Sequence, residues 1–160
     1  DAGRFGLAFI ALNSLLQIGD RADQLAAVRT LAAHLRPGGI AAIDCWLPDA
    51  EDLARFDGRL SLEYARVDPE TGHLVTKSAS ALHDATSGTV RLTAIYEEGA
   101  QGSAPVRWLR EDRLRLVSAD ELRWFAEEAG LEVELVAGDH DLGPLGPGSD
   151  RAVLVARRVV

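Results

Sequence analysis

The sequence predicts an α/β fold in which parallel strands and a final antiparallel strand form part of a sheet that an inserted antiparallel β-meander interrupts. Two apolar runs, residues 5–12 and 40–46, flank a segment whose apolar residues recur at helical spacing. Runs of alternating polarity then follow between residues 60 and 116. We therefore divide the chain into a core of residues 1–58 and 118–160 and an insert of residues 59–117.

The amino-terminal region has the pattern of a β-α-β unit. Residues 5–12 are continuously apolar, as in a strand covered on both faces, and Asp20 is a suitable helix N-cap. The apolar residues that follow share one helical face: Leu25, Val28, Leu31, Ala32 and Leu35. Leu-Arg-Pro-Gly-Gly at residues 35–39 predicts a turn that ends the helix, because proline cannot continue it and glycine permits left-handed dihedrals. Residues 40–46 should form a second strand, parallel to the first through a right-handed crossover.

The middle of the chain predicts a short helix and then four strands. Residues 49–56 carry acidic side chains that suit the positive end of a helix; as an alternative, the same carboxylates could bind a hard cation with help from other segments. The strands are expected near residues 60–65, 74–82, 89–96 and 106–116, with turns at 68–72 and 84–88 and a loop at 98–105. Consecutive strands joined in this way form an antiparallel meander.

The carboxyl-terminal region begins with Ser118-Ala119-Asp120-Glu121, which has the pattern of a capping box. The apolar face of the predicted helix contains Leu122, Phe125, Ala126 and Ala129, and Gly130 should end it in a left-handed conformation. Two further strands are predicted at residues 131–136 and 152–160. The loop between them, residues 138–150, is too rich in glycine and proline for regular structure.

Bulk composition excludes several classes of protein. The 160 residues carry a net charge of −8, which would repel nucleic acids and anionic membranes, and no apolar run is long enough to span a membrane. We therefore expect a cytoplasmic protein that binds neither nucleic acid nor membrane. Cys45 is the single cysteine, so no intramolecular disulfide can form, and we expect it to be buried in a strand. Methionine is absent, even at position 1, which predicts that the sequence is a fragment of a longer protein.

The order of strand, helix, Leu-Arg-Pro-Gly-Gly and a strand containing Asp44 resembles the second half of the class I S-adenosylmethionine-dependent methyltransferases. In that family it spans the fourth strand, the next helix and the fifth strand. The resemblance implies a Rossmann-like half-sheet, S-adenosylmethionine as the cofactor and a small-molecule methyl acceptor. It also implies that the inserted strands roof the substrate pocket. The family's glycine-rich cofactor loop is not present in the sequence, so the amino-terminal half should be missing and the fragment itself inactive.

Three segments should meet where the carboxyl ends of the parallel strands bind ligands: residues 12–15, residues 44–47 and the loop from Gly138. The resemblance implies that Leu12, Asn13 and Ser14 contact the cofactor. As an alternative, Asn13 and Ser14 cap a loop after the strand.

Candidate substrate contacts are Trp46, Trp108 and Asp139, although both tryptophans could instead pack in the core. His140 is the best candidate for a catalytic base because it lies between two acidic residues, which favour its protonated form; a solvated loop histidine is the alternative. The other histidines, His34, His73 and His83, are expected to serve local structure. Four arginines could bind an acidic substrate or line the wet face of the fourth insert strand: Arg107, Arg110, Arg113 and Arg115.

Two other functions fit the sequence. The chain could be a non-catalytic interaction module, whose exposed sheet edge near Phe5 pairs with a second copy to form a homodimer. Half of a nucleotide-dependent dehydrogenase is a third possibility, which the insert after Trp46 disfavours.

Overall fold

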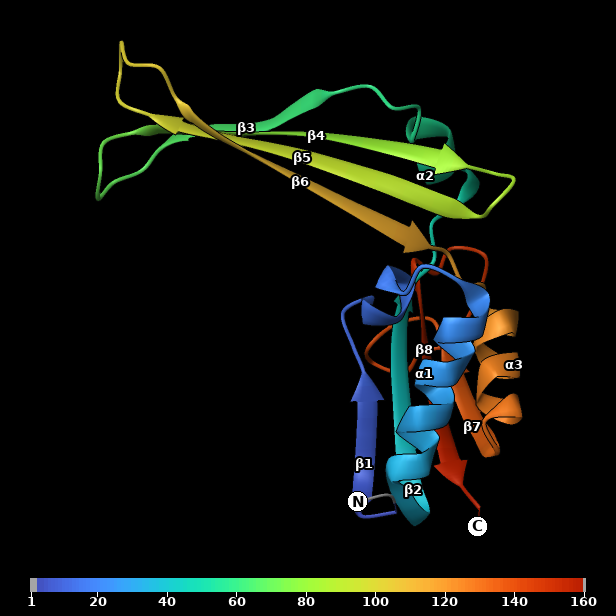
Figure 1. The fold of residues 1–160 in the computed structure, drawn as a ribbon. Coiled ribbons are helices and arrows are strands. Elements are labelled where there is room, and N and C mark those ends of the chain that lie inside the picture. Colours follow the sequence, from blue (N-terminus) through green and yellow to red (C-terminus); the bar gives the residue numbers. More distant parts are fainter. Residues whose placement is uncertain (1–2, 160) are drawn as a thin grey trace. The chain divides into compact units, whose positions relative to one another are not determined.

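The computed structural model describes residues 3–159, which belong to two units (Figure 1). The first, called the core unit here, comprises Asp1–Asp49 and Arg115–Val160. The second, the insert unit, comprises Ala50–Leu114.

The core unit contains a four-stranded mixed sheet in the order β1-β2-β8-β7. Its strands are β1 (Phe5–Ile10), β2 (Leu35–Trp46), β7 (Leu131–Ala137) and β8 (Arg151–Arg158). The first two are parallel, as predicted, and β8 runs antiparallel to both β2 and β7. The predicted α/β class, with parallel strands and a final antiparallel strand, is therefore confirmed.

Helices α1 (Arg21–His34) and α3 (Ala119–Glu128) lie side by side on one face of this sheet (Figure 1). On the face of the sheet that these helices cover, β2 and β8 pair small and branched side chains with one another. All of these side chains are buried: Ala41, Ile43, Cys45, Ala152, Leu154 and Ala156. Residues of β2 that point to the opposite face are only half-buried: Ile40, Ala42, Asp44 and Trp46. The hydrophobic core thus lies between the sheet and the two helices.

Both helices start where their caps predict. The Asp20 carboxylate accepts a hydrogen bond from the Asp23 N–H at 2.8 Å, and the Ser118 hydroxyl accepts one from the Glu121 N–H at 3.1 Å. Gly130 has the expected left-handed φ of 76°. The second half of the predicted capping box is wrong, because the Glu121 side chain binds arginines and does not return to the helix start.

Two predictions for the β-α-β unit need correction. The first strand ends at Ile10 and not at residue 12, because Leu12 and Asn13 adopt left-handed dihedrals. Residues 35–39 do not form a separate turn. Leu35 is already extended and pairs with Phe5, and β2 then bends, so that the register changes before Leu7 pairs with Ile40. A Cβ on Gly39 would lie 2.8 Å from the Arg36 carbonyl oxygen, so the bend requires glycine there.

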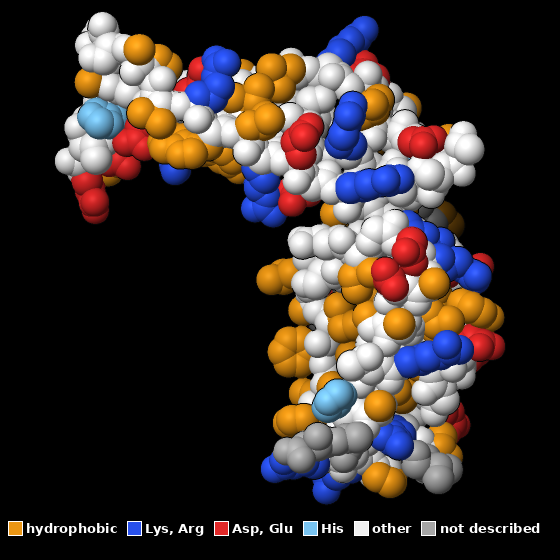
Figure 2. All heavy atoms as spheres, in the orientation of Figure 1, with side chains coloured by type: hydrophobic (Ala, Val, Ile, Leu, Met, Phe, Trp, Pro, Cys, Tyr) orange, Lys and Arg blue, Asp and Glu red, His pale blue; other side chains and the backbone are white. Residues whose placement is uncertain are grey.

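Strand β1 is more exposed than a strand covered on both faces would be. The exposed fractions of Phe5, Leu7 and Phe9 are 53%, 57% and 67%. Figure 2 shows hydrophobic side chains along this margin of the unit, where a groove of about 600 Å³ lies between β1 and α1. In the described chain, β1 pairs with another strand on one side alone.

The insert unit is a four-stranded antiparallel meander in the order β3-β4-β5-β6, as predicted. Its elements are the short helix α2 (Ala50–Arg55) and the strands β3 (Ser61–Val67), β4 (Leu74–Asp84), β5 (Thr89–Gly99) and β6 (Val106–Arg115). Val90 and Leu114 are buried in it, whereas Trp108 is half exposed.

None of the helices within residues 3–159 combines the length and the apolarity that crossing a membrane requires.

Candidate functional site

The segment after β1 forms a strained turn at the carboxyl edge of the two parallel strands. Leu12 and Asn13 have φ angles of 55° and 62°, which side chains other than glycine rarely adopt. The 3-10 helix η1 (Ser14–Gln17) begins directly after them. The Ser14 hydroxyl donates a hydrogen bond to the Ala11 carbonyl at 2.7 Å, which closes the turn.

Asn13 connects the ends of the two parallel strands. Its side-chain oxygen accepts a hydrogen bond from the Trp46 backbone N–H at 2.7 Å. The structure therefore brings together two of the predicted segments, residues 12–14 and Trp46. The Asn13 oxygen thus has a partner on a neighbouring strand and makes no hydrogen bond that caps the 3-10 helix after it, whereas the Ser14 hydroxyl does bond within its own loop.

A second polar cluster lies on the opposite side of Trp46. Arg151 pairs with Trp46 in the sheet, and its Nη1 donates to Asp44 Oδ1 at 3.1 Å and to His140 Nε2 at 3.0 Å. The distance between His140 Nε2 and Asp44 Oδ1 is 3.5 Å. Because a guanidinium can only donate, Nε2 must accept, and the neutral ring carries its proton on Nδ1. In this arrangement Nε2 cannot take a proton from a substrate until Arg151 moves away.

The side chains that contact His140 are those of Asp44 and Arg151, and not the acids that flank it in the sequence. Asp139 accepts a hydrogen bond from the Gly143 N–H at 2.8 Å and so caps its own loop. The neighbouring carboxylate is that of Asp44, on β2. His140 therefore lies at the predicted edge, but its partners come from two strands that the local sequence does not indicate.

Other predicted site residues are dispersed. Trp108 lies on β6 of the insert unit. Arg107 pairs with Glu97 and Arg110 with Asp112, which agrees with a solvated role on that strand. Among residues 3–159, no group of three or more histidine, cysteine or acidic side chains is placed to hold a metal ion.

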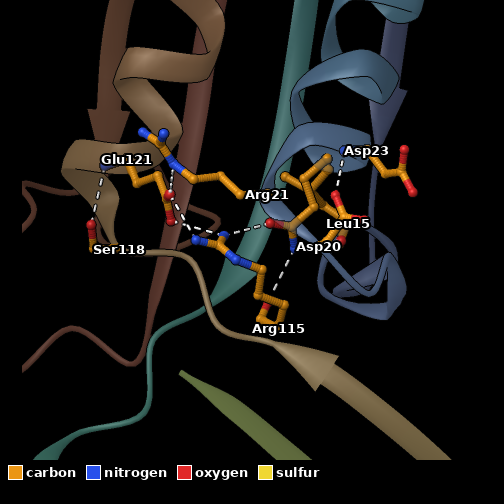
Figure 3. Close-up of polar contacts among 8 residues, drawn as sticks. Leu15, Asp20, Arg21, Asp23, Arg115, Ser118 and Glu121 are labelled. Atoms are coloured by element: carbon orange, nitrogen blue, oxygen red, sulfur yellow. Dashed lines mark hydrogen bonds and ion pairs between the residues drawn. The ribbon is translucent and has the colours of Figure 1, made fainter. Parts of the chain in front are cut away.

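Arg115 differs from the expected wet-face residue because it belongs to a largely buried network (Figure 3). Its Nη1 donates to Glu121 Oε2 at 3.0 Å and its Nη2 donates to Glu121 Oε1 at 2.9 Å. Arg21 reaches the same carboxylate at 2.7 Å, and its guanidinium lies 4.1 Å from the centre of the Trp124 ring. The network therefore joins α1 and α3 to the residue at which the chain re-enters the core unit.

Gln24 completes this network and was missed by the sequence predictions. It is fully buried, and its Nε2 donates to the carbonyl oxygens of Leu15 at 3.0 Å and Arg115 at 3.1 Å. Its Oε1 accepts from Arg115 Nη1 at 2.6 Å. The signal was present, because Gln24 lies at helical spacing from Val28 and Leu31, on the face that packs inward.

The half-buried Glu121 and the buried Cys45 both have shifted pKa values. Burial would raise the pKa of Glu121, but hydrogen bonds from Arg115 and Arg21 outweigh it, so that the pKa of Glu121 lies below its usual value. Burial, and then the neighbouring Asp44 charge, raise the pKa of Cys45 to about 12. Cys45 is therefore a neutral thiol in the sheet, as predicted, and takes no part in the site.

The edge thus offers three kinds of contact to a ligand. The first is an exposed leucine on a strained turn, the second is the half-buried Trp46, and the third is a cluster of carboxylate, guanidinium and imidazole. Apolar surface and hydrogen-bonding groups at the carboxyl edge of parallel strands are typical of a small-molecule site in an open α/β sheet.

No protein-family model matches the chain, and no curated protein sequence matches it. Solved structures do match. The CcbJ methyltransferase from Streptomyces caelestis is 25% identical with a TM-score of 0.72, and the match covers 97% of this chain and 61% of that one.

An S-adenosylmethionine-dependent methyltransferase from Clostridium acetobutylicum ATCC 824 has a TM-score of 0.74 at 16% identity, covering 96% of this chain and 58% of its own. CalS10 from Micromonospora echinaspora, an amino pentose methyltransferase solved with S-adenosylmethionine bound, has a TM-score of 0.69 at 21% identity, with 96% and 58% covered. These likenesses show that the chain has the fold of these methyltransferases, and that it spans about three-fifths of their length.

Proposed function

We propose that the chain is part of an S-adenosylmethionine-dependent methyltransferase that acts on a small molecule. The observation that carries the proposal is the likeness to CcbJ, which extends over 97% of the chain at 25% identity. Because that match covers 61% of CcbJ, we propose that the chain alone holds part of a cofactor cleft and catalyses no turnover. The acceptor would be a small molecule, as the sugar methyltransferases among its structural neighbours suggest.

The residues at the edge fit one side of such a cleft. Leu12 and the Ser14 backbone would contact the cofactor, and the Asn13–Trp46 hydrogen bond fixes the spacing of the two segments that reach it. When bound, S-adenosylmethionine supplies a methyl group already activated on a sulfonium. The protein then needs chiefly to orient the acceptor and exclude water, so that a strong catalytic dyad is not required.

On the acceptor side, we propose that Trp46 supplies apolar contact surface and that Asp139 orders the loop that carries His140. His140 would take the acceptor's proton after Arg151 releases its Nε2, while Asp44 retains the guanidinium. The assignment of Trp108 to the acceptor stays a prediction.

Titration of S-adenosylmethionine into the ¹⁵N-labelled chain tests the proposal. At about 10 mM ligand, a site with a Kd near 1 mM is about nine-tenths occupied. We expect the amide resonances of Leu12, Ser14 and Trp46 to shift, and NAD at the same concentration to leave them in place. If S-adenosylmethionine shifts no resonance at this edge, the proposal fails.

A second candidate function is self-association through β1. It is favoured by the unpaired edge of that strand and by the exposed side chains of Phe5, Leu7 and Phe9. Sedimentation velocity over a range of concentrations should then show a dimer that Phe9→Lys dissociates. Leu109→Lys, at a comparably exposed leucine of the insert unit, is the matched control. A wild-type chain that remains monomeric at high concentration excludes this function.

A further inference from the structure

The turn after β1 holds a leucine in a conformation that nothing in its own side chain favours. Leu12 has a φ of 55°, and 82% of its surface is exposed, so burial does not compensate for the conformation. The strain arises because the Cβ of an L-residue approaches the next carbonyl oxygen. Such a conformation persists only where the surroundings fix it, and it occurs preferentially at functional sites.

Asn13 fixes the turn from the sheet side. Its side-chain oxygen accepts from the Trp46 N–H at 2.7 Å, so the turn is attached to the end of β2. Asparagine suits this position because it tolerates a left-handed φ better than other side chains. A glycine there would tolerate the same φ without making the attachment.

Gln24 fixes the turn from the helix side. Its Nε2 donates to the Leu15 carbonyl, in the 3-10 helix that follows the turn, and to the Arg115 carbonyl. Its Oε1 is occupied by Arg115 Nη1, so that donor and acceptor groups of the buried amide are all engaged. An apolar residue would fill the same inward helix face, and the amide adds attachments to two separate segments.

We infer that Asn13 and Gln24 are positioning residues that hold a strained turn in place, so that Leu12 presents its side chain to the ligand. The inference rests on the proposed function, in which the ligand is S-adenosylmethionine. Asn13 then acts through the protein backbone, and Leu12 makes the apolar contact with the cofactor.

Amide hydrogen exchange tests the two attachments. The amides of Leu16 and Ile18 donate to the carbonyls of Asn13 and Leu15, respectively. Gln24→Leu should accelerate exchange of both amides by about tenfold or more. The Leu122 amide of α3 is the internal control and should exchange at its wild-type rate. Asn13→Gly should accelerate exchange at Trp46, and Asn13→Asp, which retains the acceptor oxygen, should restore protection there. Unchanged exchange in both Gln24→Leu and Asn13→Gly would overturn the inference.

Leu12→Gly tests the presentation of the side chain. Relief of the left-handed strain should raise the melting temperature, while loss of the apolar contact weakens S-adenosylmethionine binding by about fivefold. Leu142→Gly is the matched control, since Leu142 is also exposed with a φ of 62°; it should raise the melting temperature without weakening binding.

The two proposals can fail separately. If Leu12→Gly binds the cofactor as wild type does, the inference is wrong even though the proposed function stands. A wild-type chain without any shift on cofactor addition refutes the proposed function, and the exchange rates still decide whether Asn13 and Gln24 hold the turn.

Discussion

Replacing Arg115 by methionine should destabilise the core unit strongly, because Arg115 is the less exposed of the two arginines that bind Glu121 between α1 and α3. The exposed fractions of the Arg115 and Glu121 side chains are 17% and 18%. Methionine retains the apolar stem but leaves the fully buried Gln24 Oε1 without a donor, which costs about 1–3 kcal/mol. It also leaves the Glu121 carboxylate with Arg21 alone.

Removal of one partner from a fully buried ion pair costs about 3–5 kcal/mol. Residual exposure and the remaining Arg21 contact reduce that value, so we expect a loss of about 3 kcal/mol in the free energy of unfolding. Urea titration followed by the far-ultraviolet circular dichroism of the helices measures it as a lower midpoint with an unchanged slope.

Arg29→Met is the matched control, because Arg29 also pairs across α1 and α3, with Glu128 at 3.4 Å, but exposed fractions there are 54% and 46%. We expect a loss of at most about 0.5 kcal/mol. Gln24→Leu should cost less stability in the Arg115→Met background than in the wild-type chain, because the amide oxygen that it removes has already lost its donor, while the Leu15 and Arg115 carbonyls lose theirs in both backgrounds. The reasoning is refuted if Arg115→Met is no more destabilising than Arg29→Met.

Three further predictions concern Glu121, Cys45 and His140. Since the pKa of Glu121 is lower in the folded chain, its contribution to the free energy of unfolding is complete above the unfolded pKa of about 4.5 and is lost as the pH falls through the folded value. Glu121→Gln should therefore weaken the dependence of stability on acid pH, as measured by urea titrations at several pH values. An unchanged dependence would contradict this prediction. The Cys45 thiol, with its pKa raised to about 12, should react with a disulfide reagent near pH 8 only when the chain unfolds. If the native chain reacted as fast as the chain unfolded in urea, Cys45 would not be buried. The free energy of unfolding should also decline as the pH rises above the unfolded thiol pKa of about 9. Long-range ¹H–¹⁵N spectra of neutral His140 should show the tautomer with its proton on Nδ1, because Arg151 donates to Nε2. Arg151→Met removes this donor, so both tautomers should then be observed. A wild-type ring with its proton on Nε2 would contradict the hydrogen bond.

The features that sequence predicted well depend on residues a few positions apart. Asp20 and Ser118 cap their helices, and Gly130 ends the second, because each cap involves one turn of backbone. The four strands of the insert pair in sequence order since short turns between alternating segments leave few other arrangements. The parallel pairing of β1 and β2 was also predictable, because α1 directly connects them.

Features that depend on contacts between distant segments of the chain were not predicted. The helical pattern assigned Leu25 to the inward face, but Gln24 is the buried residue and Leu25 is half-buried, because Gln24 finds partners at Leu15 and Arg115. A polar residue in an apolar stripe indicates that a partner exists but does not identify it. For the same reason the sequence does not distinguish Arg115 from the other arginines of its strand, because its partner Glu121 lies on a different element.

The position of the candidate site stays a prediction from topology, and the hydrogen bonds within it were not foreseen. The edge after two parallel strands follows from topology, which brings Asn13 and Trp46 together. No spacing rule predicts that the Asn13 oxygen binds a strand amide, or that Arg151 occupies the His140 ring nitrogen. Predictions of site residues therefore need the hydrogen-bond partners before roles can be assigned.

The composition of β1 also has a consequence for handling the protein. Phe5-Gly6-Leu7-Ala8-Phe9-Ile10 carries no charge and no proline, and its outer backbone edge lacks a partner strand in the described chain. A segment of this kind is a template for open-ended stacking of identical strands into aggregates, and it is most accessible during refolding at high concentration. Arg4, directly before it, is the single charged residue adjacent to the run that can oppose such stacking. Preparation at low protein concentration, or an added charge within the run, would keep the chain in solution.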